Sequence, residues 1–417
     1  MKRKYVLVVL SLILFISGCA RNSPNINYPS DNTYHFETDS QYSFYNQGEA
    51  GVVAQSPDGY YFALVIHGEH YMFFTDKNTM QAVPLCGRPN CLHYEETDAE
   101  KKELCNARYT AAQYEGAVYY YKGKLYVPAS DLNEYVLYEF SLDGASRKEL
   151  WKIDAMIYGN NLVFHRGYMY VATSLYNENM QAQMKIQRYS LENPGRKPEL
   201  LFEKTLDKDA KLGGMNHLQD LKAYGNHLYF TLTENSFPCF YTMDLTDDNY
   251  VCKEVLENVG KVTDTQYNLS ISDGILIAGL NNQGEVSQLT GMDQLLNLPT
   301  TLYRMNLDGS SPREILKFSY GPFTSDNQYI YQWPYWALWR DGNIDEYYIR
   351  IYDREGSLLV EYDATKDVSD FYTLYASQGD HVFLTVSTCN KIYYFSKSEI
   401  ESGEIHPKLL IDCSQYQ

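Results

Sequence analysis

The stretch LYRMNLDGSSPREILKF, residues 302–318, decides the fold of this chain. An alternating run of apolar and polar residues leads into Asp308-Gly309, and a second short run with apolar positions follows. Alternation with a period of two, interrupted by Asp-Gly, is typical of a β-hairpin. The stretch holds no paired acids and no phosphate-binding loop, so it predicts scaffold rather than chemistry.

Near copies of this hairpin recur along the chain. The other copies begin at Tyr71, Leu137, Met184, Phe240, Tyr348 and Ile392. A weaker hairpin precedes each copy, with turns such as Asp58-Gly59 and Gly379-Asp380, and successive turns lie about 53 residues apart. Each repeat therefore supplies four antiparallel strands. Four-stranded units that recur every 40–50 residues or so are typical of the blades of a β-propeller.

The sequence therefore predicts an all-β chain with a single β-propeller over residues 34–417. Seven four-stranded antiparallel blades fit the repeats best, and six or eight are the alternatives. Tyrosine, at 41 of 417 residues, suits strands and the interfaces between sheets. Residues 34–46 also alternate, and we expect them either to add an outer strand to the last blade or to form an ordered arm.

The hairpin at residues 302–318 resembles the propellers of low-density-lipoprotein-receptor type, whose repeats carry a YWTD-like strand before a Leu-Asp-Gly turn. Here Leu307-Asp308-Gly309 matches the turn, but no YWTD tetrapeptide is present. That family has six blades, whereas this chain has seven repeats. The resemblance implies a propeller with a binding role, and it implies no catalytic residues.

The first residues are typical of a processing signal. Lys2, Arg3 and Lys4 precede eleven uncharged residues, which span roughly 16 Å as a helix and are too short for a hydrocarbon core of about 30 Å. We expect residues 1–18 to be a signal peptide. Ile16-Ser17-Gly18-Cys19 resembles a bacterial lipobox, which implies that Cys19 carries the lipid and becomes the N-terminus; the alternative is an ordinary secretory signal.

Residues 19–33 are polar and rich in turn formers, and they predict a flexible tether. The chain is then expected at the cell membrane, lipid-anchored on the extracytoplasmic face. Without residues 1–18 it has 32 basic and 53 acidic residues, a net charge of −21. This charge repels phosphate groups, so nucleic acid is not an expected partner and the lipid, rather than a basic patch, must anchor the protein.

The connection between the first two repeats holds Cys86, Cys91, His93 and Cys105 within twenty residues. Three thiolates and an imidazole are a ligand set for structural Zn²⁺, although the spacing lacks a CxxC knuckle. A disulfide with a spare thiol is an equal alternative outside the cytoplasm, and three reduced cysteines are the third. Similar segments occur in clostridial propeller lipoproteins of unestablished activity, which this one resembles. No other cofactor is expected.

Two further groups of residues are candidates. Trp333, Tyr335, Trp336 and Trp339 could form an aromatic platform for a sugar or peptide, and packing between blades is the alternative. Cys389 and Cys413 lie at the same end of the last repeat, so we expect a disulfide between them.

No linear signature of an enzyme, such as GxSxG or HExxH, is present. The sequence favours a non-catalytic propeller that binds a protein, peptide or glycan on one face, formed by the connections between blades. The alternative is an extracytoplasmic glycan hydrolase or lyase with its site in the central channel. Two carboxylates about 5–9 Å apart, or a histidine beside an acid, in that channel would favour the enzyme.

Overall fold

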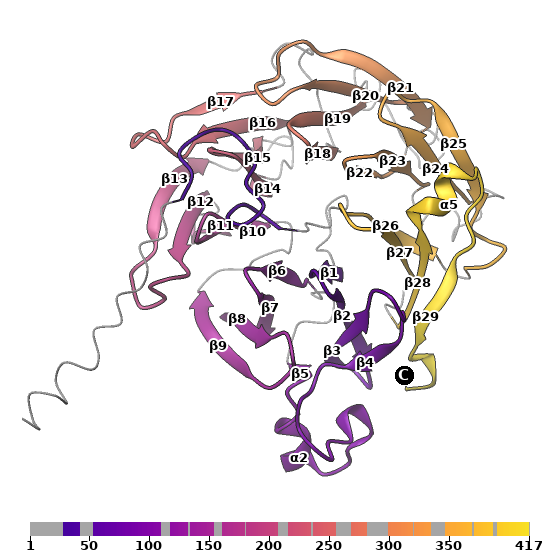
Figure 1. Cartoon of the computed structure of the whole chain (residues 1–417). Helices are drawn as coiled ribbons and strands as arrows, with labels where there is room; N and C mark the ends of the chain where they lie inside the picture. Colours follow the sequence, from indigo (N-terminus) through magenta and orange to yellow (C-terminus); the bar gives the residue numbers. More distant parts are fainter. Residues whose placement is uncertain are drawn as a thin grey trace, which may run out of the picture.

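The structure is a seven-bladed β-propeller, as the repeats predict (Figure 1). This computed structural model describes residues 28–41, 53–109, 117–131, 134–153, 161–179, 181–206, 216–234, 237–255, 268–281, 299–319, 321–334, 347–368, 371–386 and 390–416. The predicted signal peptide, Cys19, Tyr335, Trp336, Trp339 and Cys389 lie outside these residues. No helix in the described ranges is long and apolar enough to cross a membrane.

Each blade is one antiparallel sheet whose four main strands follow each other in the sequence. Blades 1 and 2 are β1 Val53–Gln55, β2 Gly59–Ile66, β3 Glu69–Asp76, β4 Ala82–Pro84; and β6 Tyr119–Tyr121, β7 Lys124–Asp131, β8 Glu134–Ser141, β9 Arg147–Ile153. Blades 3 and 4 are β10 Leu162–His165, β11 Tyr168–Tyr176, β12 Ala182–Ser190, β13 Glu199–Leu206; and β14 His217–Tyr224, β15 His227–Glu234, β16 Phe237–Asp244, β17 Cys252–Glu254.

The remaining three blades have the same order of strands. Blades 5 and 6 are β18 Asn268–Ser272, β19 Ile275–Asn281, β20 Pro299–Asn306, β21 Arg313–Ser319; and β22 Phe323–Ser325, β23 Tyr329–Gln332, β24 Tyr348–Asp353, β25 Leu358–Asp363. Blade 7 is β26 Phe371–Tyr375, β27 His381–Val386, β28 Lys391–Ser396, β29 Lys408–Asp412. The short helices among the described residues are η1 His93–Glu95, α2 Ala99–Glu103, α5 Lys397–Glu401 and η5 Ser414–Tyr416.

The hairpin of β20 and β21 shows why the repeats fold this way. The Asp308 carboxylate accepts the N–H of Ser310 at 2.9 Å, which closes the turn, and Gly309 has a φ of +79°. A Cβ at Gly309 would lie 1.8 Å from the carbonyl oxygen of Val255 in blade 4. The glycine is therefore required twice, for the turn itself and for its close approach to the neighbouring blade.

The hydrophobic core is divided among the seven interfaces between adjacent blades. Seven clusters of buried side chains each join two neighbours, for example Leu302 and Phe318 of blade 5 with Phe323 of blade 6. Between blades 7 and 1 no strand is exchanged among the described residues. Side chains make this closure: Tyr60 bonds His381 at 2.9 Å, and Ser377 donates to Gln55 at 2.9 Å.

Residues 28–41, which we call the arm, lie across the turns of blades 2, 3 and 4 (Figure 1). They form no strand, so the prediction of an added outer strand is wrong for residues 34–41, and the ordered-arm alternative holds. A side chain of the arm itself accepts a backbone N–H that a strand would use for pairing: the His35 N–H donates to the Asp39 carboxylate at 3.1 Å. Such side-chain acceptors compete with strand pairing.

Arg166, in the turn between β10 and β11, is the centre of the arm's contacts. Its guanidinium donates to the Asp39 carboxylate at 2.8 Å and to the backbone oxygens of Pro29, Asp31 and Thr33 at 2.8–3.1 Å. Asp39 is fully buried and Arg166 nearly so. Arg166 and Asp39 thus form a desolvated ion pair. Further N–H groups of the Arg166 guanidinium donate to backbone oxygens of the arm.

His165 is buried beside the docked arm and bonds to it. Its Nδ1 accepts the N–H of Ser40 at 3.3 Å, and its Nε2 donates to the oxygen of Gly225 at 2.7 Å, which requires the neutral ring. Burial lowers its pKa to about 4, while the nearby Asp39 raises it and Arg166 lowers it further. The unfolded chain, with an ordinary pKa of about 6.5, binds the proton more readily than the folded chain does.

The free energy of unfolding is therefore expected to fall as the pH drops from about 6.5 towards 4. His165→Gln, which keeps a donor towards Gly225 but cannot titrate, should flatten part of this slope. The buried His70, whose pKa is also lowered to about 4 by burial, accounts for a further part. Denaturant unfolding across this pH range is the measurement, with the exposed His406→Gln as control. An equal slope for His165→Gln and His406→Gln would contradict the assignment.

Candidate metal centre

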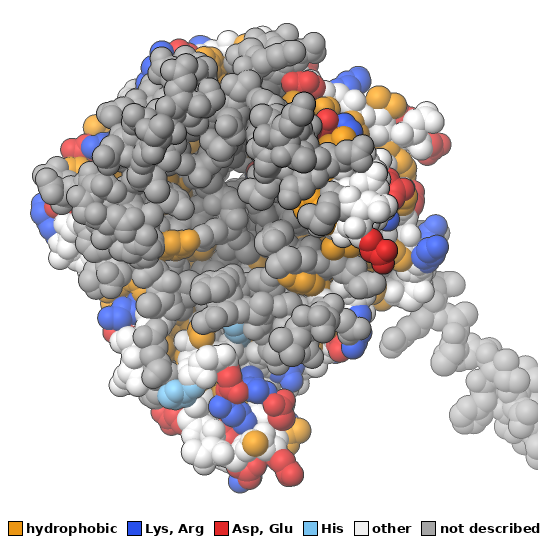
Figure 2. All heavy atoms as spheres, turned by 180° about the vertical axis from the view of Figure 1, so that it is seen from behind, with side chains coloured by type: hydrophobic (Ala, Val, Ile, Leu, Met, Phe, Trp, Pro, Cys, Tyr) orange, Lys and Arg blue, Asp and Glu red, His pale blue; other side chains and the backbone are white. Residues whose placement is uncertain are grey.

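The four residues of the predicted Cys/His cluster lie in an extension between β4 and β6. Figure 1 shows this extension, with α2, projecting from the outer rim of the ring beside blade 1. Its last strand, β5 Arg108–Tyr109, pairs with β3. Lys, Arg, Asp and Glu side chains are mixed on its surface (Figure 2). The sequence placed the segment on the face formed by the connections between blades, whereas the structure places it at the rim.

Contacts with blades 1 and 2 fix the extension. Asn106 donates to the backbone oxygens of Gly144 and Ala145 in the turn between β8 and β9 at 2.9 and 3.0 Å. Glu69 of β3 accepts ion pairs from Lys102 at 2.6 Å and Arg108 at 2.9 Å. A Cβ at Gly144, whose φ is +67°, would lie 2.7 Å from the backbone N of Cys86. The backbone that carries the cysteines is therefore held against two blades.

Local structure positions each donor. Cys86 lies two residues after the end of β4, and its N–H donates to the backbone oxygen of Pro84 at 2.9 Å. His93 starts η1 with a φ of +53°, an uncommon conformation for a residue with a Cβ. Cys105 ends the turn after α2, where its N–H donates to Lys102 at 3.0 Å. Asp98 caps α2 by accepting the N–H of Glu100 and of Lys101.

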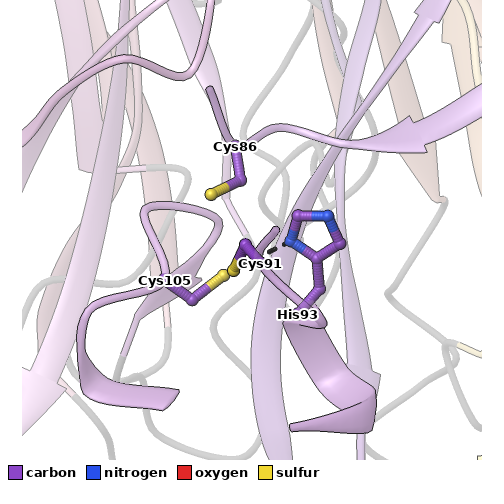
Figure 3. A group of neighbouring side chains, drawn as sticks. All are labelled: Cys86, Cys91, His93 and Cys105. Carbon is purple, nitrogen blue, oxygen red and sulfur yellow. Dashed lines mark hydrogen bonds between the residues drawn. The ribbon is translucent and has the colours of Figure 1, made fainter. Parts of the chain in front are cut away.

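The side chains of these four residues converge (Figure 3). The three Sγ atoms and the nearest ring nitrogen of His93 all lie within 4.8 Å of one another, and Cys105 Sγ is 3.7 Å from Nδ1 of His93. Cys105 is buried, and the other three are half-buried. No disulfide joins the cysteines in the described part of the chain.

The surroundings lower the pKa of the Cys86 thiol and raise that of the Cys105 thiol. Burial raises the pKa of Cys86, but backbone N–H donors at Arg88 and Asn106 outweigh it and hold the pKa below its ordinary value. Burial raises the pKa of Cys105 to about 12, and the neighbouring Cys86 adds to the shift. Burial also lowers the pKa of His93, which keeps the ring neutral and able to ligate. Cys86 thus ionises more readily than Cys105.

The donor set suits a tetrahedral ion of the zinc type. A Zn–S distance of about 2.3 Å puts two ligand sulfurs about 3.8 Å apart, which the present separations reach with a small contraction. Binding releases the remaining thiol protons, because the thiolate is the ligand. With four protein donors no coordination position stays open for substrate, so the arrangement can hold structure but offers no metal-bound water for catalysis.

The other predicted site residues are divided between the core and the undescribed part of the chain. Trp333 is 1% exposed and packs in the cluster between blades 6 and 7. For this side chain the alternative of packing between blades therefore holds. Cys413 is buried, and its N–H donates to the oxygen of Asn390 at 2.8 Å, so the backbone next to Cys389 lies close to it. The disulfide itself stays a prediction, because Cys389 is outside the described residues.

A polar cavity of about 490 Å³ opens at the turns between the first and second strands of blades 4 to 7. Tyr34 of the arm, Asp273 and Asp326 are part of its lining. Asp326 is 3% exposed and binds Lys397 of blade 7 at 2.6 Å and the hydroxyl of Tyr331 at 2.8 Å. This carboxylate therefore joins blade 6 to blade 7.

Sequence reasoning missed the Arg166–Asp39 pair and the neutral His165 beside it. The partners are 127 residues apart, and the turn residue Arg166 has no local feature that points to the arm. The sequence showed only that Arg166-Gly167 is a turn. The structure adds that a Cβ on Gly167 would lie 2.1 Å from the hydroxyl of Tyr28, so the arm requires a glycine at this position.

Comparison with known proteins supports the fold. No protein-family model matches the chain, and no curated protein sequence matches it. A solved structure of a prolyl endopeptidase is similar over 90% of this chain and 50% of its own, with a TM-score of 0.50 and 11% identity. A structure of an acylaminoacyl peptidase is similar over 91% of this chain and 53% of its own, with a TM-score of 0.50 and 6% identity.

The periplasmic gluconolactonase of Pseudomonas aeruginosa is also similar, over 88% of this chain and 95% of its own, with a TM-score of 0.49 and 10% identity. This chain spans about half the length of the two peptidases. At such low identity the likeness to the two peptidases supports the propeller fold alone and carries no activity with it.

Proposed function

We propose that this chain is a non-catalytic binding protein, held at the extracytoplasmic face of the cell membrane by a lipid on Cys19, with a structural zinc ion in its extension. The convergence of Cys86, Cys91, His93 and Cys105 is the observation that carries the zinc part of the proposal. A metal ion bound by four protein donors would stabilise the extension, whose helix α2 has no buried residues.

His93 favours zinc over a disulfide. A disulfide with a spare thiol requires the three cysteines alone and gives no role to the histidine. Yet His93 adopts a positive φ, and its Nδ1 lies 3.7 Å from a sulfur. A backbone conformation that costs free energy is maintained where an interaction compensates for it, and ligation of a metal supplies such an interaction.

Two acidic side chains near the channel, Asp39 and Asp326, are already engaged, and this favours binding over catalysis. The pair of His165 and Asp39 has no exposed surface, and both ring nitrogens are already used. Asp326 is tied to Lys397. These groups are engaged in holding the arm and the blades, which supports a scaffold that binds rather than a hydrolase or lyase acting on glycans.

A protein, peptide or glycan is the class of ligand that we propose, on the face formed by the connections between blades. The resemblance to YWTD-type propellers and to clostridial propeller lipoproteins supports this role, although the seven blades depart from the six of the YWTD family. From the sequence we expect the Trp336 region and the connection from β13 to β14 on this face. Both lie outside the described residues.

Replacement of the lipidated cysteine tests the anchoring. The full-length chain expressed in a bacterial host is expected in the membrane fraction and in the detergent phase of a detergent–water partition, and Cys19→Ser is expected in the aqueous phase. A single acyl chain gives only marginal membrane binding, and the two acyl chains of a diacylglycerol give stable anchoring. Cys239→Ser, at a half-buried cysteine of blade 4, is the matched control. Equal partition of Cys19→Ser and the wild type would overturn the anchoring.

A further inference from the structure

The propeller has two ends, and the arm docks on only one of them. The arm face is the end formed by the turns between first and second strands, such as Arg166-Gly167, and by those between third and fourth strands. The opposite face is formed by the turns between second and third strands and by the connections between blades. In Figure 1 the arm lies over blades 3 and 4 on the side towards the viewer.

The arm is fixed along its whole described length. Tyr28, its first described residue, donates to Glu192 in the turn between β12 and β13 at 2.7 Å, and the Lys122 ammonium lies 4.8 Å from its ring centroid. Asn32 accepts the N–H of Asn226 at 3.1 Å. A Cβ at Gly225 would lie 2.5 Å from the Asn32 side chain, so this turn is shaped to the arm.

These contacts make a short connection between the membrane and one face. Only eight residues separate Cys19 from Tyr28, and a chain of nine steps spans at most about 32 Å when fully extended. The strand β12, with nine residues, crosses the blade over a distance of about 30 Å. A lipid on Cys19 can therefore reach a bilayer next to the arm face easily, whereas a bilayer at the opposite face requires a tether stretched along the whole blade.

Charge does not compete with this geometry. Without residues 1–18 the chain carries a net charge of −21, which disfavours its approach to anionic headgroups overall, so the tether rather than charge selects the end near the lipid. We infer that the docked arm orients the propeller on the bilayer, with the arm face towards the lipid surface and the opposite face, where we propose ligand binding, directed away from it. This inference rests on the proposed lipid anchor.

Blade 3 offers a matched pair of positions for the test. Gly195, in the turn between β12 and β13, has an open surrounding on the arm face. Glu178, exposed in the turn between β11 and β12, lies at the other end of the same blade. A fluorescent non-natural amino acid at each position, in the lipidated full-length chain on vesicles of zwitterionic lipid, reports energy transfer to acceptors on the headgroups.

Transfer is expected to be greater from position 195 than from position 178. Arg166→Met, which frees the arm, should reduce this difference, and circular dichroism checks that the propeller is still folded. Should Arg166→Met unfold the chain, Asn32→Ala, which removes a peripheral contact of the arm, takes its place. Vesicle-bound protein with equal transfer from both positions, or greater transfer from 178, would overturn the orientation alone. Protein that fails to float with the vesicles would overturn the anchor and the orientation together.

Discussion

His93→Asn is expected to remove the proposed zinc ion from the extension. Asparagine tolerates the positive φ of this position, so the substitution removes the imidazole ligand without adding backbone strain. Structural zinc contributes about 10–16 kcal/mol of apparent binding free energy in small domains, and loss of one ligand should forfeit much of it. The measurement is metal content after dialysis, together with proteolysis of the extension, which should be cut faster in the variant.

This substitution separates the alternatives for the cluster. If two of the cysteines form a disulfide, His93→Asn should leave metal content and proteolysis unchanged, because the histidine takes no part in the bridge. His406→Asn, at an exposed histidine of blade 7, is the matched control and should behave as the wild type does. Cys105→Ser is less informative, because a fully buried hydroxyl destabilises the extension whether or not a metal is bound.

Arg166→Met is expected to release the arm and to lower the free energy of unfolding by about 3–5 kcal/mol, the usual result of removing one partner of a buried ion pair. Asp39 would remain buried without its cation, and the oxygens of Pro29, Asp31 and Thr33 would lose their donor. Denaturant unfolding measures the loss, and limited proteolysis should now cut within residues 28–41.

Two further variants interpret this result. Arg166→Met combined with Asp39→Leu should recover part of the stability, because the uncompensated charge is gone. Arg350→Met removes one partner of the half-exposed pair with Glu361 on blade 6 and should cost no more than about 1 kcal/mol. A loss for Arg166→Met as small as that for Arg350→Met would contradict the role of Arg166 as the centre of the arm's contacts.

The parts of the fold that were predictable depend on contacts close in sequence. Asp308-Gly309 and its counterparts determine hairpins through local hydrogen bonds and a positive φ, so the strands and the number of blades could be read from the repeats. Cys86, Cys91, His93 and Cys105 lie within twenty residues, and their convergence could be anticipated for the same reason.

The parts that could not be predicted depend on contacts distant in sequence. Alternation in residues 34–41 suggested a strand, but Asp39 bonds the backbone of His35 and the guanidinium of Arg166, and these bonds hold the arm in a non-strand conformation. The extension's place at the rim follows from Asn106 meeting the Gly144 turn of blade 2, which no local pattern reveals. Trp333 was similarly a candidate for an aromatic binding platform, but it is buried because blades 6 and 7 pack around it, and the sequence does not show how these blades pack.

Native mass spectrometry of the mature chain, with peptide mapping of residues 86–105, tests the central claim most directly. The four-donor site predicts a chain that carries one zinc ion, with Cys86, Cys91 and Cys105 alkylated as free thiols only after a chelator removes the metal. A zinc-free chain in which two of these three cysteines are joined in one bridged peptide would contradict it.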